Sequence, residues 1–529
     1  MKKIITILLV CFALNIFAVD ELYYQITSEI DAYGPIYGEE TLNSSRLVSL
    51  MFLPLLSVSI GGDTEPILLK GPLPASGTTL ADLSVKYSFE LKEGILWSNE
   101  EELTADDVIF TFKVVKNDAT LATNAKDKLR EVMSMTKTGR YSFDVVFKHE
   151  SQDNLGAMFF KILPKSSFPD VDDNYPIIHK SDTFFKKKPI TNGLYIARRA
   201  TGDYTILEYN ETYYNPAIVP RIESITVEKV NEEAIIVTNF LGEEDINFLP
   251  NMPIGRKDEI DAMVEFGVLQ MLDYTWQFLA FNLRNPVLQD LELRKAMTYA
   301  FDKSGANSSL YQGYAQEISG PFPPGHQSYN TNVDGNFTPE IDLANEILQK
   351  NGYLKPSSNS NRVKDGNELK FRVVIDASRE ESRNLFNYLM NSFKDAGIEL
   401  EADYVSNEEY TRKVFEDRDF DMAVVGYSFG SDPNPYTIFH SSTGKIKRGF
   451  NVCGLDDHFI DSLLEEANSK KQRAAKIAVY HMIHQEIANL CPGIFLWRRP
   501  TFIAYDTDIE GLNLNTIDDL DIFKYIYKW

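Results

Sequence analysis

Apolar and polar positions along the chain follow the two-residue period of strands in some segments and the helical period in others. Residues 83–91 alternate between apolar and polar side chains, which predicts a strand with one exposed face. The same alternation, or a short apolar run, predicts further strands at residues 141–148, 195–209 with a turn at 201–203, 226–230, 278–282 and 371–376.

Segments with helical spacing separate these strands. We expect a helix to begin at Ala105, because Thr104 is a favourable N-cap residue and acidic side chains follow in the first turn. Further helices are predicted at residues 291–301 and 382–396, and Gly397 is suited to end the second of them. Strands and helices that alternate in this way indicate an α/β fold, in which ligands bind at the carboxyl ends of strands.

Two predicted helices near the end of the chain, at residues 456–469 and 472–490, are joined by a short turn. They should therefore lie antiparallel, which brings their outer ends together. Cys453 precedes the first helix and Cys491 follows the second. Two interpretations are open: a Cys453–Cys491 disulfide, or two separate buried thiols.

The first 18 residues have the composition of a secretory signal peptide. Lys2 and Lys3 precede an apolar run too short to cross a bilayer, and small residues follow near Ala18. We expect cleavage after Ala18, while Cys11 leaves a lipoprotein signal with a lipid anchor as the alternative. The expected location is the periplasm or the cell surface.

Composition limits the possible partners. A chain of 529 residues is too long for one hydrophobic core, so we expect two or three domains. The formal net charge of −24 argues against nucleic acid and anionic membrane surfaces as partners. The sequence contains no glycine-rich phosphate loop, so any ATP hydrolysis is expected in a partner subunit.

The most specific pattern lies in two adjacent segments, Phe89-Glu-Leu-Lys-Glu-Gly-Ile-Leu-Trp97 and Leu103-Thr-Ala-Asp-Asp-Val-Ile-Phe-Thr-Phe112. Together they resemble a signature of the bacterial extracellular solute-binding proteins, family 5, which includes oligopeptide- and dipeptide-binding proteins of ABC importers. The resemblance extends over about residues 22–515. Its other matches follow in the family's order at residues 210–214, 242–245, 281–282, 293–302, 396–398 and 419–427.

The resemblance implies a periplasmic-binding-protein-like α/β fold, with two lobes that close about a hinge and an extra domain. It also implies a non-catalytic, monomeric receptor without a cofactor, which captures short peptides and delivers them to an ABC permease in the cytoplasmic membrane. A relative that binds a metal chelate, a sugar or an opine is the alternative. The implied boundaries are residues 1–18 for the signal peptide, 19–60 with 189–273 and 498–529 for lobe I, 61–188 for the extra domain and 274–497 for lobe II.

Asp432 is the first candidate for contact with the ligand. In peptide-binding relatives, the aspartate of the matching segment holds the ligand's α-amino group, and Asp432 matches it. A buried carboxylate needs a cation, which an ammonium ligand supplies. The alternative role of Asp432 is to cap the turn at residues 433–435.

Four further residues are candidates for the same site. Tyr427 and Trp276 are suited to form aromatic walls, and their alternative role is packing in the core. Arg379 and Arg383 flank the start of a predicted helix and are suited to bind a ligand carboxylate, and their alternative role is that of solvated surface residues.

Two other patterns lack the context that their chemistry requires. Residues 426–430 form a Gly-x-Ser-x-Gly sequence around Ser428, but a nucleophile elbow needs a helix directly after the serine, which Pro433 and Pro435 oppose. An exported serine hydrolase is therefore the less favoured alternative. His481 and His484 lack the spacing of a zinc-protease helix, so no metal site is predicted.

Overall fold

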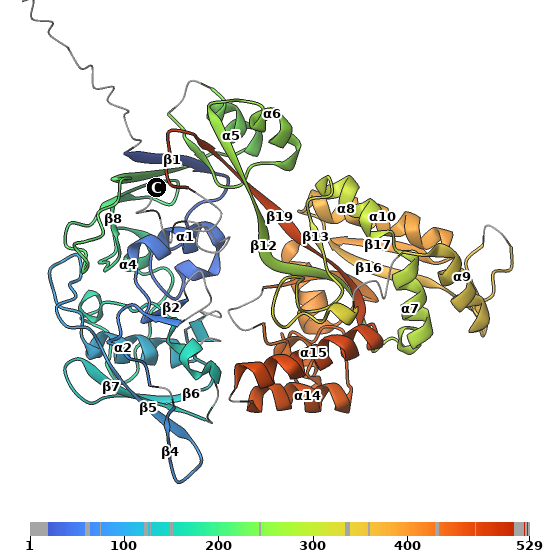
Figure 1. The fold of residues 1–529 in the computed structure, drawn as a ribbon, viewed down its shortest axis with the longest axis horizontal. Coiled ribbons are helices and arrows are strands. Elements are labelled where there is room, and N and C mark those ends of the chain that lie inside the picture. The colour runs from blue at the N-terminus through green and yellow to red at the C-terminus, as the bar shows by residue number, and fades with distance from the viewer. Residues whose placement is uncertain are drawn as a thin grey trace, which may run out of the picture.

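The protein consists of two lobes joined by a pair of long strands, β12 (Phe266–Phe281) and β19 (Gly493–Asp506), as Figure 1 shows. The predicted two-lobed α/β fold is confirmed. This structure is a computed structural model and describes residues 20–58, 64–74, 76–120, 125–126, 129–148, 150, 152–242, 245–333, 339–357, 360–428, 433–470, 472–512, 523, 526 and 529. Within these ranges, no helix combines the length and the apolar character needed to cross a bilayer.

The first lobe contains a four-stranded sheet in the order β1-β10-β9-β8. β1 runs parallel to β10, and the other neighbours are antiparallel. The predicted turn at residues 201–203 joins β8 to β9. The elements of this region are β1 (Glu21–Ile26), η1 (Gly38–Glu40), α1 (Leu42–Met51), α4 (Thr183–Lys186), β8 (Tyr195–Ala200), β9 (Tyr204–Tyr209), β10 (Ser224–Lys229), α5 (Glu233–Phe240), β11 (Phe248–Leu249), η4 (Ile254–Arg256) and α6 (Lys257–Asp261).

A second sheet in the same half of the molecule is antiparallel and has the order β4-β5-β7-β6. β5 and β7 bury every second residue, as the alternation of their sequences predicts. One continuous apolar core, containing Leu22 of the first sheet and Phe147 of the second, extends through both sheets. The elements here are β2 (Leu56–Val58), β3 (Thr64–Pro66), β4 (Thr78–Thr79), β5 (Val85–Glu90), α2 (Ala105–Lys116), β6 (Val132–Lys137), β7 (Ser142–Phe147), η2 (Gln152–Met158) and η3 (Lys165–Ser167).

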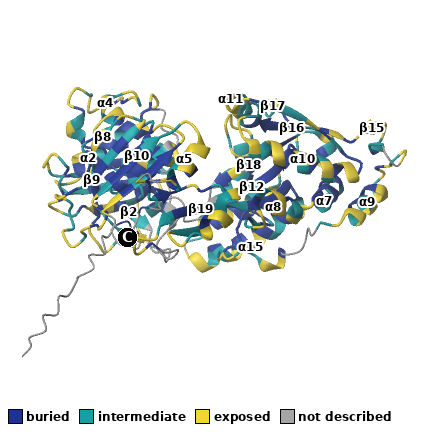
Figure 2. Cartoon of the chain, turned by 90° about the horizontal axis from the view of Figure 1, so that it is seen from above, coloured by how far each residue is buried: buried dark blue, intermediate teal, exposed yellow. Residues whose placement is uncertain are grey.

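The second lobe is built on the larger part of a seven-stranded sheet with the path β11-β19-β12-β18-β16-β17, to which β13 adds beside β19, while β11 at one end of the path lies in the first lobe. Both faces of this sheet are covered by helices, and Figure 2 shows the strands buried between them. The strands and first helices are η5 (Pro286–Gln289), α7 (Leu291–Ala300), α8 (Lys303–Tyr311), β13 (Gln316–Glu317), η6 (Thr331–Val333), α9 (Ile341–Lys350), β14 (Val363–Lys364), β15 (Asn367–Glu368), β16 (Lys370–Asp376) and α10 (Glu380–Asp395). The remaining elements are β17 (Glu399–Val405), α11 (Asn407–Thr411), η7 (Arg412–Asp417), β18 (Met422–Ser428), α12 (Tyr436–Phe439), α13 (Ser441–Gly444), α14 (His458–Ser469) and α15 (Arg473–Leu490).

The crossing between the lobes is an irregular part of the β12–β19 pair. Leu272 is paired with Pro500 and Trp276 with Arg498, so β12 has extra residues opposite β19 at this point. Such a bulge bends a strand pair and increases its twist. Met271 packs in the core of the first lobe and Trp276 in a core of the second, so the bulge lies where the strands pass from one lobe to the other.

The helix ends agree with their sequences. The Thr104 side chain accepts a hydrogen bond at the start of α2, and the Asp107 carboxylate accepts one from the Thr104 amide at 2.9 Å. After α10, Gly397 has a φ of 77° and its amide donates to the Lys394 carbonyl at 2.9 Å, while the Ile398 amide donates to Phe393 at 2.9 Å. These two bonds form a Schellman C-cap, which favours glycine at this position.

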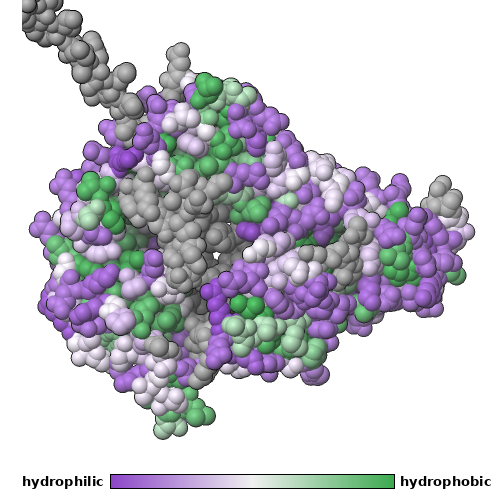
Figure 3. Space-filling model, in the orientation of Figure 1, coloured by the Kyte–Doolittle hydropathy of each residue, from purple (hydrophilic) through white to green (hydrophobic). Residues whose placement is uncertain are grey.

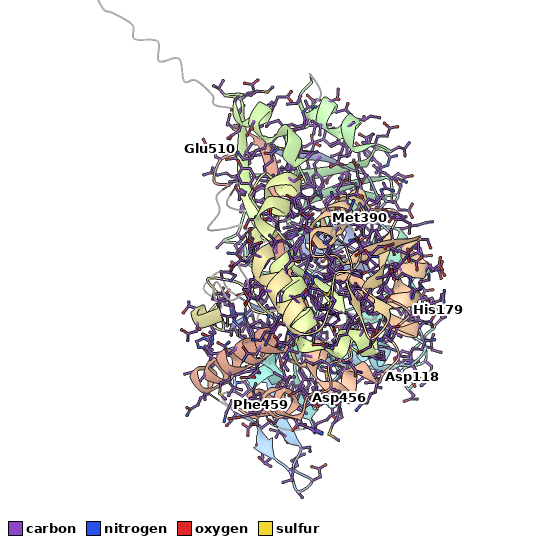
Figure 4. The ribbon with its side chains drawn as sticks, turned by 90° about the vertical axis from the view of Figure 1, so that its right-hand side faces the viewer. Asp118, His179, Met390, Asp456, Phe459 and Glu510 are labelled. Atoms are coloured by element: carbon purple, nitrogen blue, oxygen red, sulfur yellow. The ribbon has the colours of Figure 1, made fainter. Side chains whose placement is uncertain are left out.

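The predicted helical hairpin of α14 and α15 is confirmed, but the disulfide interpretation is wrong. Cys453 and Cys491 are both free thiols, and both are buried. The Cys491 Sγ donates to the Ala488 carbonyl at 3.1 Å, and burial raises the pKa of both thiols to about 12. The hairpin forms one edge of lobe II, where Figure 4 labels Asp456 and Phe459 at its start.

Candidate functional site

The carboxyl ends of three strands of lobe II meet beside the crossing between the lobes. β16 runs parallel to β17 and to β18, so all three strands end at the same edge of the sheet. Ser428, the last residue of β18, is paired with Thr275, which lies within the bulge of β12. The loop that follows β18 therefore begins at the crossing. Figure 3 shows that hydrophilic residues make up most of the coloured surface of both lobes in this view.

Asp432 belongs to this loop but lies outside the described residues, which end at Ser428 and resume at Pro433. Pro433 is buried, and the Asn434 side chain accepts a hydrogen bond from the Tyr436 amide at 3.0 Å. Ser428, which precedes the loop, is thus at the crossing, and the role of Asp432 stays a prediction.

Asp376, the last residue of β16, organises the same edge. Its carboxylate accepts hydrogen bonds from the Ser378 amide at 3.0 Å, the Ser378 hydroxyl at 2.6 Å and the Asn407 amide group at 2.8 Å. Burial acts to raise the pKa of Asp376, but the bonds from Asn407 and Ser378 outweigh it and hold this pKa below its usual value. This carboxylate therefore joins the end of β16 to the residues that follow β17, and its hydrogen-bond partners are groups of the protein itself.

The two candidate arginines lie at this edge, where α10 begins. The Arg379 Nε is 3.4 Å from an Asp376 carboxylate oxygen, and its side chain is 59% exposed. Arg383 is also exposed, and its Nη1 donates to the Ala377 carbonyl at 2.7 Å. Both guanidinium groups face solvent beside the crossing, and their contact with a ligand carboxylate stays a prediction.

Trp276 and Tyr427 pack in the core in this conformation, which agrees with their alternative role, and their contact with a ligand stays a prediction. Only 1% of Trp276 and 7% of Tyr427 is exposed, and their rings are 5.4 Å apart. Phe495 packs on Trp276 at 5.5 Å, and the Tyr427 hydroxyl donates to the Phe450 carbonyl at 2.6 Å. In this conformation the two side chains stabilise lobe II from within.

The structure adds charged residues at the crossing that the sequence analysis missed. The Arg499 Nη1 lies 3.1 Å from a Glu381 carboxylate oxygen of α10, and the Tyr311 hydroxyl donates to the same carboxylate. Arg498, opposite the bulge, donates to the Leu272 carbonyl at 3.3 Å. In the sequence, this pair of arginines interrupts an otherwise apolar strand, and that interruption was the signal from which the two residues could have been found. These contacts couple the start of α10 to the strands that join the lobes.

The other chemical patterns have structural roles among the described residues. The His484 Nδ1 accepts a hydrogen bond from the Asn330 amide at 3.0 Å, and the His481 Nε2 is 2.9 Å from the Gln327 carbonyl. After Ser428, the next described helix is α12, which begins at Tyr436 behind the two prolines. The described residues Pro433 to Pro435 are therefore not part of the helix that a nucleophile elbow requires directly after its serine.

Two α/β lobes joined by crossing strands, with strand ends at the crossing, are the architecture of the periplasmic-binding-protein-like fold. The chain belongs to the bacterial extracellular solute-binding proteins, family 5, whose middle-region model matches residues 72–448. Members of this family are extracytoplasmic solute-binding proteins of ABC importers.

Comparison with individual proteins shows both peptide- and metal-binding relatives. The oligopeptide-binding protein AppA of Bacillus subtilis is 26% identical over 458 residues, which are 85% of this chain and 81% of AppA. The solved AppA structure, in complex with a nonapeptide, has a TM-score of 0.76 at 22% identity and covers 96% of this chain and 98% of its own. NikZ of Campylobacter jejuni, in complex with Ni(L-His), has a TM-score of 0.76 at 20% identity and covers 96% and 99%. At these identities the two structures show a shared fold.

Proposed function

We propose that this protein captures short peptides between its two lobes and delivers them to an ABC permease in the cytoplasmic membrane. The observation that carries the proposal is the position of the sheet edge where β16, β17 and β18 end. This edge lies at the crossing, about which the two lobes would rotate when they close. A guest held there gains contacts to both lobes on closure, and that difference in affinity drives the closure. The relation to AppA of Bacillus subtilis supports peptide as the ligand class.

Within this proposal, Asp432 holds the α-amino group of the peptide, and Arg379 or Arg383 meets a carboxylate. The loop of Asp432 starts beside Thr275 at the crossing, and both arginines lie at the end of the neighbouring strand. A peptide that spans this edge would then have its charged groups matched by opposite charges of lobe II.

The ligand class can be tested by native mass spectrometry of the purified mature protein, because tight binders often retain a ligand. We expect a heterogeneous set of retained masses that correspond to short peptides. One non-peptide mass would instead identify a metal chelate, a sugar or an opine. Stoichiometric labelling of Ser428 by a fluorophosphonate would support the exported serine hydrolase and contradict the receptor.

Replacement of Asp432 by alanine should weaken binding of a retained peptide at least tenfold, measured by isothermal titration calorimetry. A charge-assisted hydrogen bond contributes on the order of 1.5–3 kcal/mol, and its loss leaves the ligand ammonium without its partner. Asp456→Ala is the matched control, since Asp456 is 61% exposed and pairs with Lys445 on the surface of lobe II. Equal affinities of the wild type and Asp432→Ala would contradict the assigned role.

We also propose that the first 18 residues, which lie outside the described residues, are removed on export. N-terminal sequencing of the secreted protein should begin at Val19. A mature protein that begins at a lipid-modified Cys11 would establish the lipoprotein alternative.

A further inference from the structure

Lobe II contains a cavity of about 250 Å³ that the proposed peptide site does not use. It lies between α7, the start of α8, the end of α15 and the start of β19. Gly493 and Phe495 of β19 are paired with Ala280 and Phe278, which follow the irregular segment of β12 on the side of lobe II. This volume is slightly below the range of pockets that hold drug-sized ligands, which indicates a smaller guest.

A lysine and a glutamate face this cavity without forming an ion pair. The Lys303 Nζ donates to the Ile318 carbonyl at 2.8 Å, and no described carboxylate lies within 4.0 Å of it. Burial lowers the pKa of Lys303 to about 8, and the charge of Glu317 partly opposes this shift. The Glu317 side chain makes no hydrogen bond or ion pair to the part of the chain that the structure describes, although it acts on Lys303 through space.

The position of Lys303 also favours a bound carboxylate. Lys303 and Ser304 form the first turn of α8, where the helix dipole stabilises negative charge and destabilises an ammonium group. The Asp302 side chain caps the Gly305 amide at 2.9 Å. A carboxylate in the cavity would pair with the lysine in a desolvated setting, where charge-assisted bonds are strong.

The two charges together select the type of guest. A simple anion would be attracted by Lys303 but repelled by Glu317. A simple cation would be attracted by Glu317 but repelled by Lys303. A molecule that carries both charges satisfies both side chains. The remainder of the lining suits a short side chain, because it combines small or apolar residues with hydroxyl groups, namely Ile318, Val333, Ala488, Phe495, Ser319 and Tyr329.

We propose that this cavity binds a free α-amino acid as its zwitterion, with the carboxylate on Lys303 and the ammonium group on Glu317. The Ser319 and Tyr329 hydroxyls, which lie 3.1 Å apart, offer polar contacts to the same guest. No described residue that the peptide proposal invokes lines this cavity, so the amino-acid site does not depend on that proposal.

Isothermal titration calorimetry of the full mature protein with L-alanine and L-serine tests this site. We expect at least one of them to bind, and N-acetyl-L-alanine and L-alaninamide, each of which lacks one of the two charges, to bind at least tenfold more weakly. Lys303→Met and Glu317→Gln should each weaken binding of the amino acid at least tenfold. Lys295→Met is the matched control, since Lys295 pairs with Glu292 on the outside of α7, and its affinity should equal that of the wild type.

Thermal melting shows whether the variants are folded, and we expect Lys303→Met to melt no lower than the wild type because it removes a desolvated charge. The Asp432→Ala variant should keep its affinity for the amino acid, which separates this cavity from the peptide site. Absence of binding by both amino acids at millimolar concentration would overturn the proposal. Binding that survives in folded Lys303→Met and Glu317→Gln would overturn it as well.

Discussion

Arg294→Met should lower the free energy of unfolding by about 2–4 kcal/mol, measured by chemical denaturation followed by circular dichroism. Arg294 is 5% exposed and lies on α7, and its guanidinium group donates only to backbone carbonyls in the contacts seen here. Burial lowers its pKa from the usual value. The hydrogen bonds run to Leu288 at 2.8 Å, Gln289 at 2.9 Å, Leu490 at 2.6 Å and Cys491 at 2.9 Å.

Two of these carbonyls belong to the end of α15 and its C-cap, where the helix dipole is negative and a cation is stabilising. Methionine fills a similar volume but leaves all four carbonyls without this donor, and each buried group then costs free energy. Lys295→Met is the control, because Lys295 is a neighbour on α7 whose ion pair with Glu292 is partly exposed, and it should change the stability by less than about 0.5 kcal/mol. Equal effects of the two substitutions would show that Arg294 does not hold α15 to α7.

The sequence predicted those parts of the fold that short segments determine by themselves. Thr104 and Gly397 mark helix ends through local hydrogen bonds, so both were found without knowledge of the tertiary structure. β5 and β7 have one covered face, and their alternation therefore carries the pattern of a strand.

The long strands that cross between the lobes were predicted only in part, because their extent depends on tertiary contacts between segments far apart in the sequence. Residues 278–282 were predicted as a strand, whereas β12 begins at Phe266. Pro500 lies within β19, and a proline argues against a central strand unless it sits at an irregularity. It is paired with Leu272 at the edge of the bulge, where the ladder is interrupted.

Side-chain direction was the other limit. The two helices of the hairpin bring Cys453 and Cys491 to the same region, but a disulfide also requires a specific arrangement of the Cβ atoms. Cys491 has a φ of 44° at the end of α15, and its thiol bonds to its own last turn. The sequence contains no information on this direction, so the hairpin was predicted correctly and the disulfide was not.

The same limit applies to the aromatic residues of the site. Trp276, Phe278 and Ala280 belong to one core cluster, and Leu279 and Phe281 belong to the other. Both faces of β12 are buried in lobe II, so alternation along the strand does not distinguish a ligand-facing side chain from a core side chain. Charged residues of the edge, such as Asp376, can be placed near the crossing only when the pairing of β16 with β18 is known.

Trp276→Ala should lower the free energy of unfolding by about 3–5 kcal/mol, in the same denaturation experiment. The side chain is 1% exposed and contacts the rings of Phe278 at 5.4 Å, Tyr427 at 5.4 Å and Phe495 at 5.5 Å. Truncation removes these contacts and leaves a cavity, which the surrounding strands fill only in part because they are held by the sheet.

Phe459→Ala is the matched truncation of an aromatic side chain, since Phe459 is 52% exposed on α14 (Figure 4) and should change the stability by less than about 0.5 kcal/mol. Trp276→Phe keeps part of the packing and should fall between the two. Because the indole lies inside lobe II, the folded Trp276→Phe variant should bind peptide with the affinity of the wild type. A tenfold loss of peptide affinity in this variant, without a change in stability, would instead make Trp276 a wall of the ligand site in the closed conformation.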